Sequence, residues 1–187
     1  MTEPDASARV GGLADPSDER SNCGVGAVVD LDGGRSHEVV SDALDLLENL
    51  EHRGTTGAEQ NTGDGAGIMI ERPDEFFEGV VGDLPETYAV GSVFMPTDDA
   101  AREELEALFE STLADYDLGV SAWRDVPTDA AGADLGRTAL EAEPDVRQVF
   151  VAPEEGVDLD EETFDRRLYV ARRAVESAAD ELAGERF

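Results

Sequence analysis

The only cysteine in the chain, Cys23, is the residue whose type and setting most directly suggest chemistry. It follows a leader, residues 1–22, that is polar, acidic and rich in Gly, Pro, Ser and Asp. Cleavage after Asn22 would give Cys23 a free α-amine beside its thiol, and an unperturbed α-amine with a pKa of about 7.7–8.0 suits a general base. The structural alternative is a cysteine buried in a strand as a small hydrophobe. Residue type alone leaves both interpretations open.

A glycine-rich stretch, residues 52–67 (H-R-G-T-T-G-A-E-Q-N-T-G-D-G-A-G), holds the second group of candidate residues. It has no helical periodicity, so we expect a loop whose backbone N–H and C=O groups can line a ligand pocket. Arg53 could hold a carboxylate, or it could be a surface arginine paired with Glu51 or Glu59. The glycine spacing differs from that of a phosphate-binding loop, so nucleotide binding has little support.

The histidines do not suggest a metal site. His37 and His52 lie fifteen residues apart, without a second cysteine or a helical i, i+4 pair to complete a ligand set. At the end of a predicted helix, His52 is expected to interact with the helix terminus or to orient the loop.

Hydrophobic patterning predicts the elements that must position these residues. The β-branched, apolar residues 23–31 predict a buried strand, and residues 68–70 predict a short second strand. A helix is predicted from Ser36, as its N-cap, to about Leu50. The remaining predicted elements are strands at residues 86–96, 120–126 and 147–152 and helices at residues 98–116 and 161–183. This order predicts an α/β or α+β fold with helices packed on sheets, and 187 residues suit one domain.

The charge of the chain argues against two classes of partner. It has 45 acidic and 14 basic residues, a formal net charge of -31 and no lysine, which disfavours nucleic acid and anionic membrane surfaces. The leader lacks the features of a secretory signal and no apolar run approaches about 20 residues, so we expect a cytoplasmic protein. Carboxylates spread along the whole chain favour a halophilic protein, because molar salt shrinks the Debye length to about 3 Å. The alternative is an acidic protein from a mesophile.

Several ordered segments of the chain resemble the N-terminal part of the glutaminase domain of glutamate synthases, a class II glutamine amidotransferase domain. The principal segments are C-G-V-G at residues 23–26, S-H-E-V-V-S-D-A-L-D-L-L-E-N-L-E-H-R-G at 36–54 and G-D-G-A-G-I at 63–68. The similarity continues through Y-A-V-G-S-V-F-M-P at 88–96, R-Q-V-F-V at 147–151 and F-D-R-R-L-Y-V-A-R-R at 164–173.

The resemblance implies an α+β fold, the four-layer αββα sandwich of N-terminal nucleophile hydrolases, incomplete in this chain. It also implies that residues 1–22 are removed and that residues 23–187 form the N-terminal part of the glutaminase domain. Carried over residue by residue, Cys23 is the nucleophile and supplies the base through its α-amine. Arg53 and Gly54 then shape the site around the thiol, Gly54 through its backbone. The implied reaction is hydrolysis of L-glutamine to glutamate and ammonia.

Two segments that the family uses do not occur in this sequence. One resembles H-S-R-F-S-T, whose arginine holds the α-carboxylate of glutamine, and the other resembles N-G-E, which forms the oxyanion hole. We therefore expect the substrate-binding residues beyond Phe187 and almost no activity from the chain alone, because losing one oxyanion donor costs about 10²–10³ in rate.

The resemblance places the remaining chemistry elsewhere in a longer parent protein. There, FMN and an iron–sulfur cluster support the reductive amination of 2-oxoglutarate with the released ammonia, and no cofactor is expected in this chain. The implied partners are L-glutamine and the remaining synthase domains or subunits. A non-catalytic, partner-binding module of the same fold is the alternative function.

Overall fold

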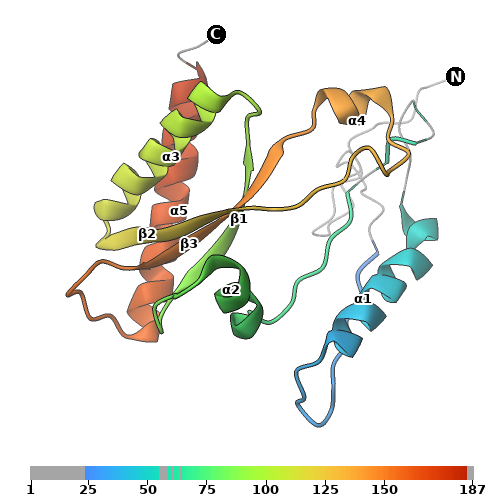
Figure 1. Ribbon diagram of the computed structural model, residues 1–187, viewed down its shortest axis with the longest axis horizontal. Helices are drawn as coiled ribbons and strands as arrows, with labels where there is room; N and C mark the ends of the chain where they lie inside the picture. The colour runs from blue at the N-terminus through green and yellow to red at the C-terminus, as the bar shows by residue number, and fades with distance from the viewer. Residues whose placement is uncertain (1–23, 55–58, 60, 64, 185–187) are drawn as a thin grey trace, which may run out of the picture. The chain divides into compact units, whose positions relative to one another are not determined.

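The computed structural model describes residues 24–54, 59, 61–63 and 65–184. It divides into two compact units, Met1–Met69 and Ile70–Phe187, which are described separately. Figure 1 shows a small sheet with helices in the second unit and a helix, α1, in the first. The combination of helices with an antiparallel sheet confirms the predicted α+β class at this level.

The second unit is built on a three-stranded antiparallel sheet of order β1-β3-β2. Its strands are β1 (Ala89–Met95), β2 (Leu118–Asp125) and β3 (Asp145–Pro153), all close to predicted positions. The central strand, β3, has a neighbour on both sides and contains four consecutive buried residues, at positions 149–152. Val149 and Val151 share one of its faces, as their alternation predicts.

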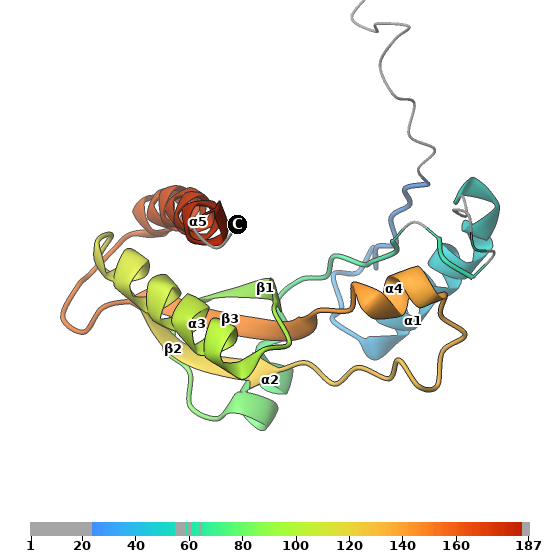
Figure 2. The ribbon, with the colours of Figure 1, turned by 90° about the horizontal axis from the view of Figure 1, so that it is seen from above.

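Two helices cover that face of the sheet, α3 (Asp99–Ala114) and α5 (Glu161–Gly184), as Figure 2 shows. Both were predicted from their apolar stripes. The Asp98 side chain caps α3 by accepting a hydrogen bond from the N–H of Ala101, 2.9 Å away. The buried core between these helices and the sheet consists of Leu113, Leu118, Val149, Val151, Phe164 and Ala171.

The opposite face of the sheet packs on α2 (Asp74–Val81). Phe77 meets Phe150 edge to face, with 5.1 Å between ring centroids, and Tyr88 lies beside the same ring. Toward the far end of β1, Phe94 is 71% exposed. A one-turn helix, α4 (Arg137–Glu141), lies between β2 and β3 in the chain.

The first unit contains α1 (His37–Asn49), followed by a 3-10 turn, η1 (Glu51–Arg53). The predicted helix start at Ser36 is confirmed in position, since Ser36 is the N-cap residue, but its side chain forms no capping hydrogen bond. No residue of α1 is fully buried within the described part of the chain.

Two strand predictions were wrong. Residues 23–31 and 68–70 were expected in strands, yet the structure assigns none of residues 24–31 and 68–70 to a strand, and Cys23 lies outside the described residues. Their β-branched composition is a local signal, whereas a strand exists only where a second segment supplies ladder hydrogen bonds. Two helices were not predicted, α2 and α4, the latter in the connection between the predicted strands at 120–126 and 147–152.

Among the described residues, no helix is both long and apolar enough to cross a bilayer.

Candidate active site

The candidate site residues lie at the C-terminal end of α1 and around η1. Arg53 is the last residue of η1, and Gly54 follows it in an extended conformation. Cys23 lies outside the described residues, but its neighbour Gly24 is described. Gly24 lies against Arg53, so the structure brings the segment that follows Cys23 to one of the two predicted partner residues.

A tight set of backbone hydrogen bonds fixes η1 to α1. The N–H of Leu50 donates to the carbonyl of Leu46 at 3.1 Å, and the N–H of Arg53 donates to the carbonyl of Leu50 at 2.7 Å. The N–H of Gly54 donates to the carbonyl of Glu51 at 3.0 Å. Because this N–H is engaged in the turn, any backbone contribution of Gly54 to a site falls to its carbonyl oxygen.

His52 supports the same turn. Its Nδ1 lies 3.0 Å from the carbonyl oxygen of Asn49, where a protonated Nδ1 donates a hydrogen bond to one of the last helix carbonyls. This confirms the expected interaction of His52 with the helix terminus.

Gly24 and Gly26 contact one stripe of this helix. A Cβ on Gly24 would lie 3.1 Å from Arg53 Cβ and 3.2 Å from Leu50 Cδ2. A Cβ on Gly26 would lie only 2.3 Å from Leu46 Cδ2. At both glycines an added side chain would therefore require the neighbouring helix side chains, or the glycine backbone, to move.

Arg53 is exposed at the end of this turn. Within the described part of the chain, no ion pair joins it to Glu51 or Glu59, the partners expected of an ordinary surface arginine. Its guanidinium is therefore not committed to either of these carboxylates.

The glycine-rich stretch is described only in part, because residues 55–58, 60 and 64 lie outside the described residues. In the described portion, the Thr62 hydroxyl donates to Glu59 Oε2 at 2.9 Å and the Thr62 N–H donates to the Glu59 carbonyl at 3.2 Å. Gly65 and Gly67 have open space where a Cβ would stand. Over the ranges that are described, no three His, Cys, Asp or Glu residues are grouped so as to hold a metal ion.

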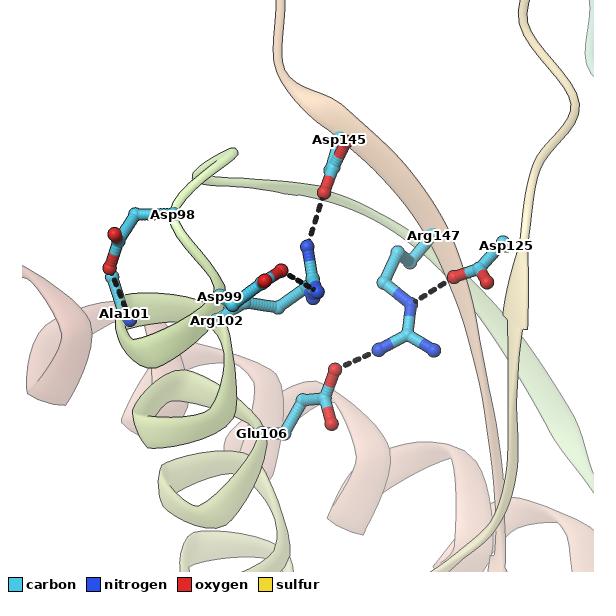
Figure 3. Close-up of polar contacts among 8 residues, drawn as sticks. All are labelled: Asp98, Asp99, Ala101, Arg102, Glu106, Asp125, Asp145 and Arg147. Carbon is cyan, nitrogen blue, oxygen red and sulfur yellow. Dashed lines mark hydrogen bonds and ion pairs between the residues drawn. The ribbon is translucent and has the colours of Figure 1, made fainter.

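An arginine network in the second unit was not found from the sequence (Figure 3). Arg102 on α3 pairs with Asp145 at 2.5 Å and with Asp99 at 2.5 Å. On β3, Arg147 pairs with Glu106 of α3 and with Asp125 of β2. The Nε of Arg147 lies 2.7 Å from Asp125 Oδ1, but its N–H is not aimed at that oxygen, so this contact is ionic rather than a hydrogen bond.

This network is structural rather than a substrate site. Burial, and secondarily the charge of Arg102, lowers the pKa of Arg147, whose guanidinium also lies 5.3 Å from the centre of the Trp123 ring. A pocket of about 240 Å³ opens beside both arginines, lined also by Asp125 and Asp145. Since both guanidiniums are already paired with carboxylates, the pocket offers no unpaired cation to the carboxylate of an amino acid. Its contacts tie α3 to the sheet.

Comparisons with known proteins identify the family of the chain. A model of the class-II glutamine amidotransferase family covers residues 23–186, so the match begins at Cys23. The chain is 40% identical over 172 residues to "Glutamate synthase [NADH]" of Schizosaccharomyces pombe, covering 86% of this chain and 8% of that protein. It is 37% identical over 175 residues to "Ferredoxin-dependent glutamate synthase, chloroplastic" of Spinacia oleracea, covering 89% and 10%.

A bacterial relative extends the pattern. "Glutamate synthase [NADPH] large chain" of Bacillus subtilis is 34% identical over 170 residues, covering 89% of this chain and 11% of the relative. The chain thus spans about a tenth of the length of the curated relatives it matches. Because the family model covers almost all of residues 23–187, the chain belongs to the class-II glutamine amidotransferases.

Proposed function

We propose that this chain is part of the glutaminase domain of a glutamate synthase and that Cys23 is its nucleophile, hydrolysing L-glutamine to glutamate and ammonia. The observation that carries the proposal is the start of the family match at Cys23, the only cysteine in the chain. The similarity to three glutamate synthases supports a glutamate synthase as the parent protein. Because the names of these relatives give three different electron donors, the similarity does not identify the donor that the parent protein uses.

The reaction that follows from an N-terminal cysteine has two steps. The α-amine takes the thiol proton, and the thiolate attacks the side-chain amide carbon of glutamine. The carbon–nitrogen bond breaks, and ammonia leaves with the proton that the amine held. Water then attacks the thioester carbon and gives a proton to the amine, while the carbon–sulfur bond breaks, releasing glutamate and restoring the thiol.

Arg53 and Gly54 are proposed to shape the site around this thiol. The carbonyl oxygen of Gly54 can accept a hydrogen bond from the protonated α-amine of Cys23, since the Gly54 N–H is engaged in the η1 turn. The Arg53 guanidinium, uncommitted to Glu51 or Glu59, adds positive charge near a site that forms a thiolate and releases glutamate, which is an anion.

The complete domain is proposed to be a four-layer αββα sandwich. Exposed apolar residues support this, because Val25, Val29 and Leu31 are 86%, 75% and 95% exposed although their composition suits a buried strand. Further sequence is proposed to pair with this segment and to supply the H-S-R-F-S-T-like and N-G-E-like segments. Without them the tetrahedral intermediate lacks its oxyanion donors, so the 187-residue chain is expected to be nearly inactive alone.

The parent protein is proposed to use the ammonia in the reductive amination of 2-oxoglutarate at an FMN and iron–sulfur site outside this chain. Iron–sulfur clusters are held by several cysteine thiolates, and this chain has a single cysteine, so its residues do not fit a cluster. The proposed partners are therefore the synthase domains or subunits that carry those groups.

The proposal can be tested with an extended protein. This is the chain beginning at Cys23 and joined to the sequence that follows the matched region in a relative, including the two missing segments. We expect it to release ammonia from L-glutamine, and we expect Cys23→Ser to abolish that release, because a hydroxyl is far less acidic than a thiol. Undiminished ammonia release by Cys23→Ser, or none by a folded extended protein with Cys23 intact, would contradict the proposal.

A further inference from the structure

The segment that follows Cys23 lies along a single stripe of α1 and η1. Leu46 lies on α1, Leu50 is the C-cap residue of α1 and Arg53 ends η1, and each of them faces Gly24 or Gly26. Gly24 and Gly26 both direct their missing side chains at this stripe, and Val25 between them is 86% exposed. The alternation is that of an extended segment with one face on the helix.

Close contact with α1 and η1, and not an unusual backbone conformation, explains why residues 24 and 26 are glycines. Among the described glycines, only Gly33, Gly82 and Gly156 have the positive φ angles that favour glycine. Gly24 and Gly26 therefore have backbone angles that other residues can adopt. What limits the space for a side chain is Leu46, since a Cβ on Gly26 would lie 2.3 Å from Leu46 Cδ2 and 3.0 Å from Leu46 Cγ, so that either the Leu46 side chain or the backbone at Gly26 would have to move.

We propose that Leu46, together with the side-chain-free faces of Gly24 and Gly26, forms a seat that positions the cysteine nucleophile relative to η1. In this arrangement Leu46 is a positioning residue, since it acts through the backbone of Gly26 and not on the substrate. The inference rests on the proposed role of Cys23. It adds that the geometry of the site depends on how closely Gly24 and Gly26 approach the helix, although neither glycine carries a reactive group.

The physical reason is the short connection between the seat and the nucleophile. Gly24 is joined to Cys23 by one peptide bond, and Gly26 follows two residues later. The peptide planes between them transmit a displacement of the backbone at Gly26 toward Cys23. A misplacement of about 1 Å in a reacting group can cost about 10²-fold in rate, so even a small lift from the helix should be visible in kcat.

The test uses glutamine hydrolysis by the extended protein. Gly26→Ala should lower kcat by about tenfold or more and leave KM within about twofold, because the nucleophile is misplaced while the substrate contacts remain. Leu46→Ala alone should also lower kcat, by several-fold, because the seat is lost. The double variant Gly26→Ala with Leu46→Ala should recover to within about threefold of the wild type, because the new methyl group occupies space that the leucine vacates.

Matched controls separate the seat from general effects of the substitutions. Gly79→Ala, in α2 with nothing within 4 Å of the added Cβ, controls for the change of glycine to alanine. Leu44→Ala, on α1 with a side chain that is 47% exposed, controls for shortening a leucine on the same helix. Both should retain kcat within about twofold, and circular dichroism should show every variant folded under the assay conditions.

The outcomes distinguish this inference from the proposed function. A wild-type kcat in Gly26→Ala, or a double variant no better than Gly26→Ala, overturns the seat, while loss of activity in Cys23→Ser leaves the proposed function standing. Activity that persists in Cys23→Ser overturns the proposed function and this inference together. If Gly26→Ala does not fold, the comparison of Leu46→Ala with Leu44→Ala decides, and equal kcat values in that pair overturn the seat.

Discussion

Gly24 and Arg53, twenty-nine residues apart in sequence, are in such close contact that a Cβ on the glycine would lie 3.1 Å from Arg53 Cβ and 3.3 Å from Arg53 Cγ. This contact joins the two halves of the candidate site, the segment after Cys23 and the turn that ends α1. It involves the first atoms of the Arg53 side chain, so the position of the backbone and the charge of the guanidinium can be altered separately.

Arg53→Ala should separate these two contributions. The variant keeps Cβ, so the contact with Gly24 should remain and the thermal midpoint should stay within about 2 °C of the wild type, as for most surface substitutions. Ammonia release by the extended protein should fall about tenfold or more, because the guanidinium is removed from the site. Gly24→Ala, measured in parallel, should lower both the midpoint and the rate. Full activity in Arg53→Ala would remove Arg53 from the site.

Removal of the leader is expected to precede activity. The α-amine of Cys23 can act as a base only when it is not part of a peptide bond, so active protein should begin at Cys23. Intact mass and N-terminal sequencing of active material check this. Full glutaminase activity from protein that retains residues 1–22 would exclude the α-amine as the base, and a non-catalytic binding module would gain nothing from the cleavage.

Folding is expected to require high salt. The 45 acidic residues far outnumber the 14 arginines, so salt should stabilise the fold by screening the repulsion between carboxylates. Salt also weakens exposed ion pairs such as Arg166–Glu162, but these contribute little to stability. A titration with potassium chloride, followed by circular dichroism, should show cooperative folding that strengthens toward molar salt. A thermal transition in salt-free buffer equal to that in molar salt would leave the acidity unexplained.

Tyr88 should make stability fall at high pH. Burial, assisted by the hydrogen bond that its hydroxyl donates to Asp74 at 2.7 Å, raises the pKa of Tyr88 to about 12. The unfolded value is about 10, so this contribution is complete below pH 10 and is lost as the pH rises through 12. Tyr88→Phe should therefore cost about 1 kcal/mol at pH 8 and show a smaller decline between pH 10 and 12, measured by urea unfolding. An identical alkaline decline in both proteins would contradict this.

The elements that could be predicted from sequence are those whose signal is long and local. The 24-residue helix α5 buries Phe164 and Val175 at the spacing the pattern predicts, and Val149 and Val151 of β3 lie on one face of the sheet as expected. In contrast, α2 has eight residues with Gly79 inside and only Phe77 buried, which leaves too few turns for a period to be recognised. The segment after Cys23 has strand composition without a strand, because composition does not specify a pairing partner.

In the candidate site, too, the local features could be predicted from the sequence and the long-range contacts could not. Its residue types could be identified from the sequence and from the resemblance, and the turn that holds His52, Arg53 and Gly54 lies where the predicted helix ends. The contact of Gly26 with Leu46 could not be predicted, because it joins residues twenty positions apart through an absent side chain. The pairing of Arg102 with Asp145, forty-three residues away, is likewise a consequence of packing α3 on the sheet.

Covalent trapping of the extended protein with an electrophilic analogue of glutamine tests the role of Cys23 most directly. The chain supplies a single thiol, so intact mass and peptide mapping can assign an adduct to it without ambiguity once other cysteines in the added sequence are replaced. We predict one adduct per molecule, located on Cys23, formed more slowly when L-glutamine is present and absent in Cys23→Ser. An adduct on another residue, or labelling of Cys23 at the same rate with and without L-glutamine, would contradict its assignment as the nucleophile.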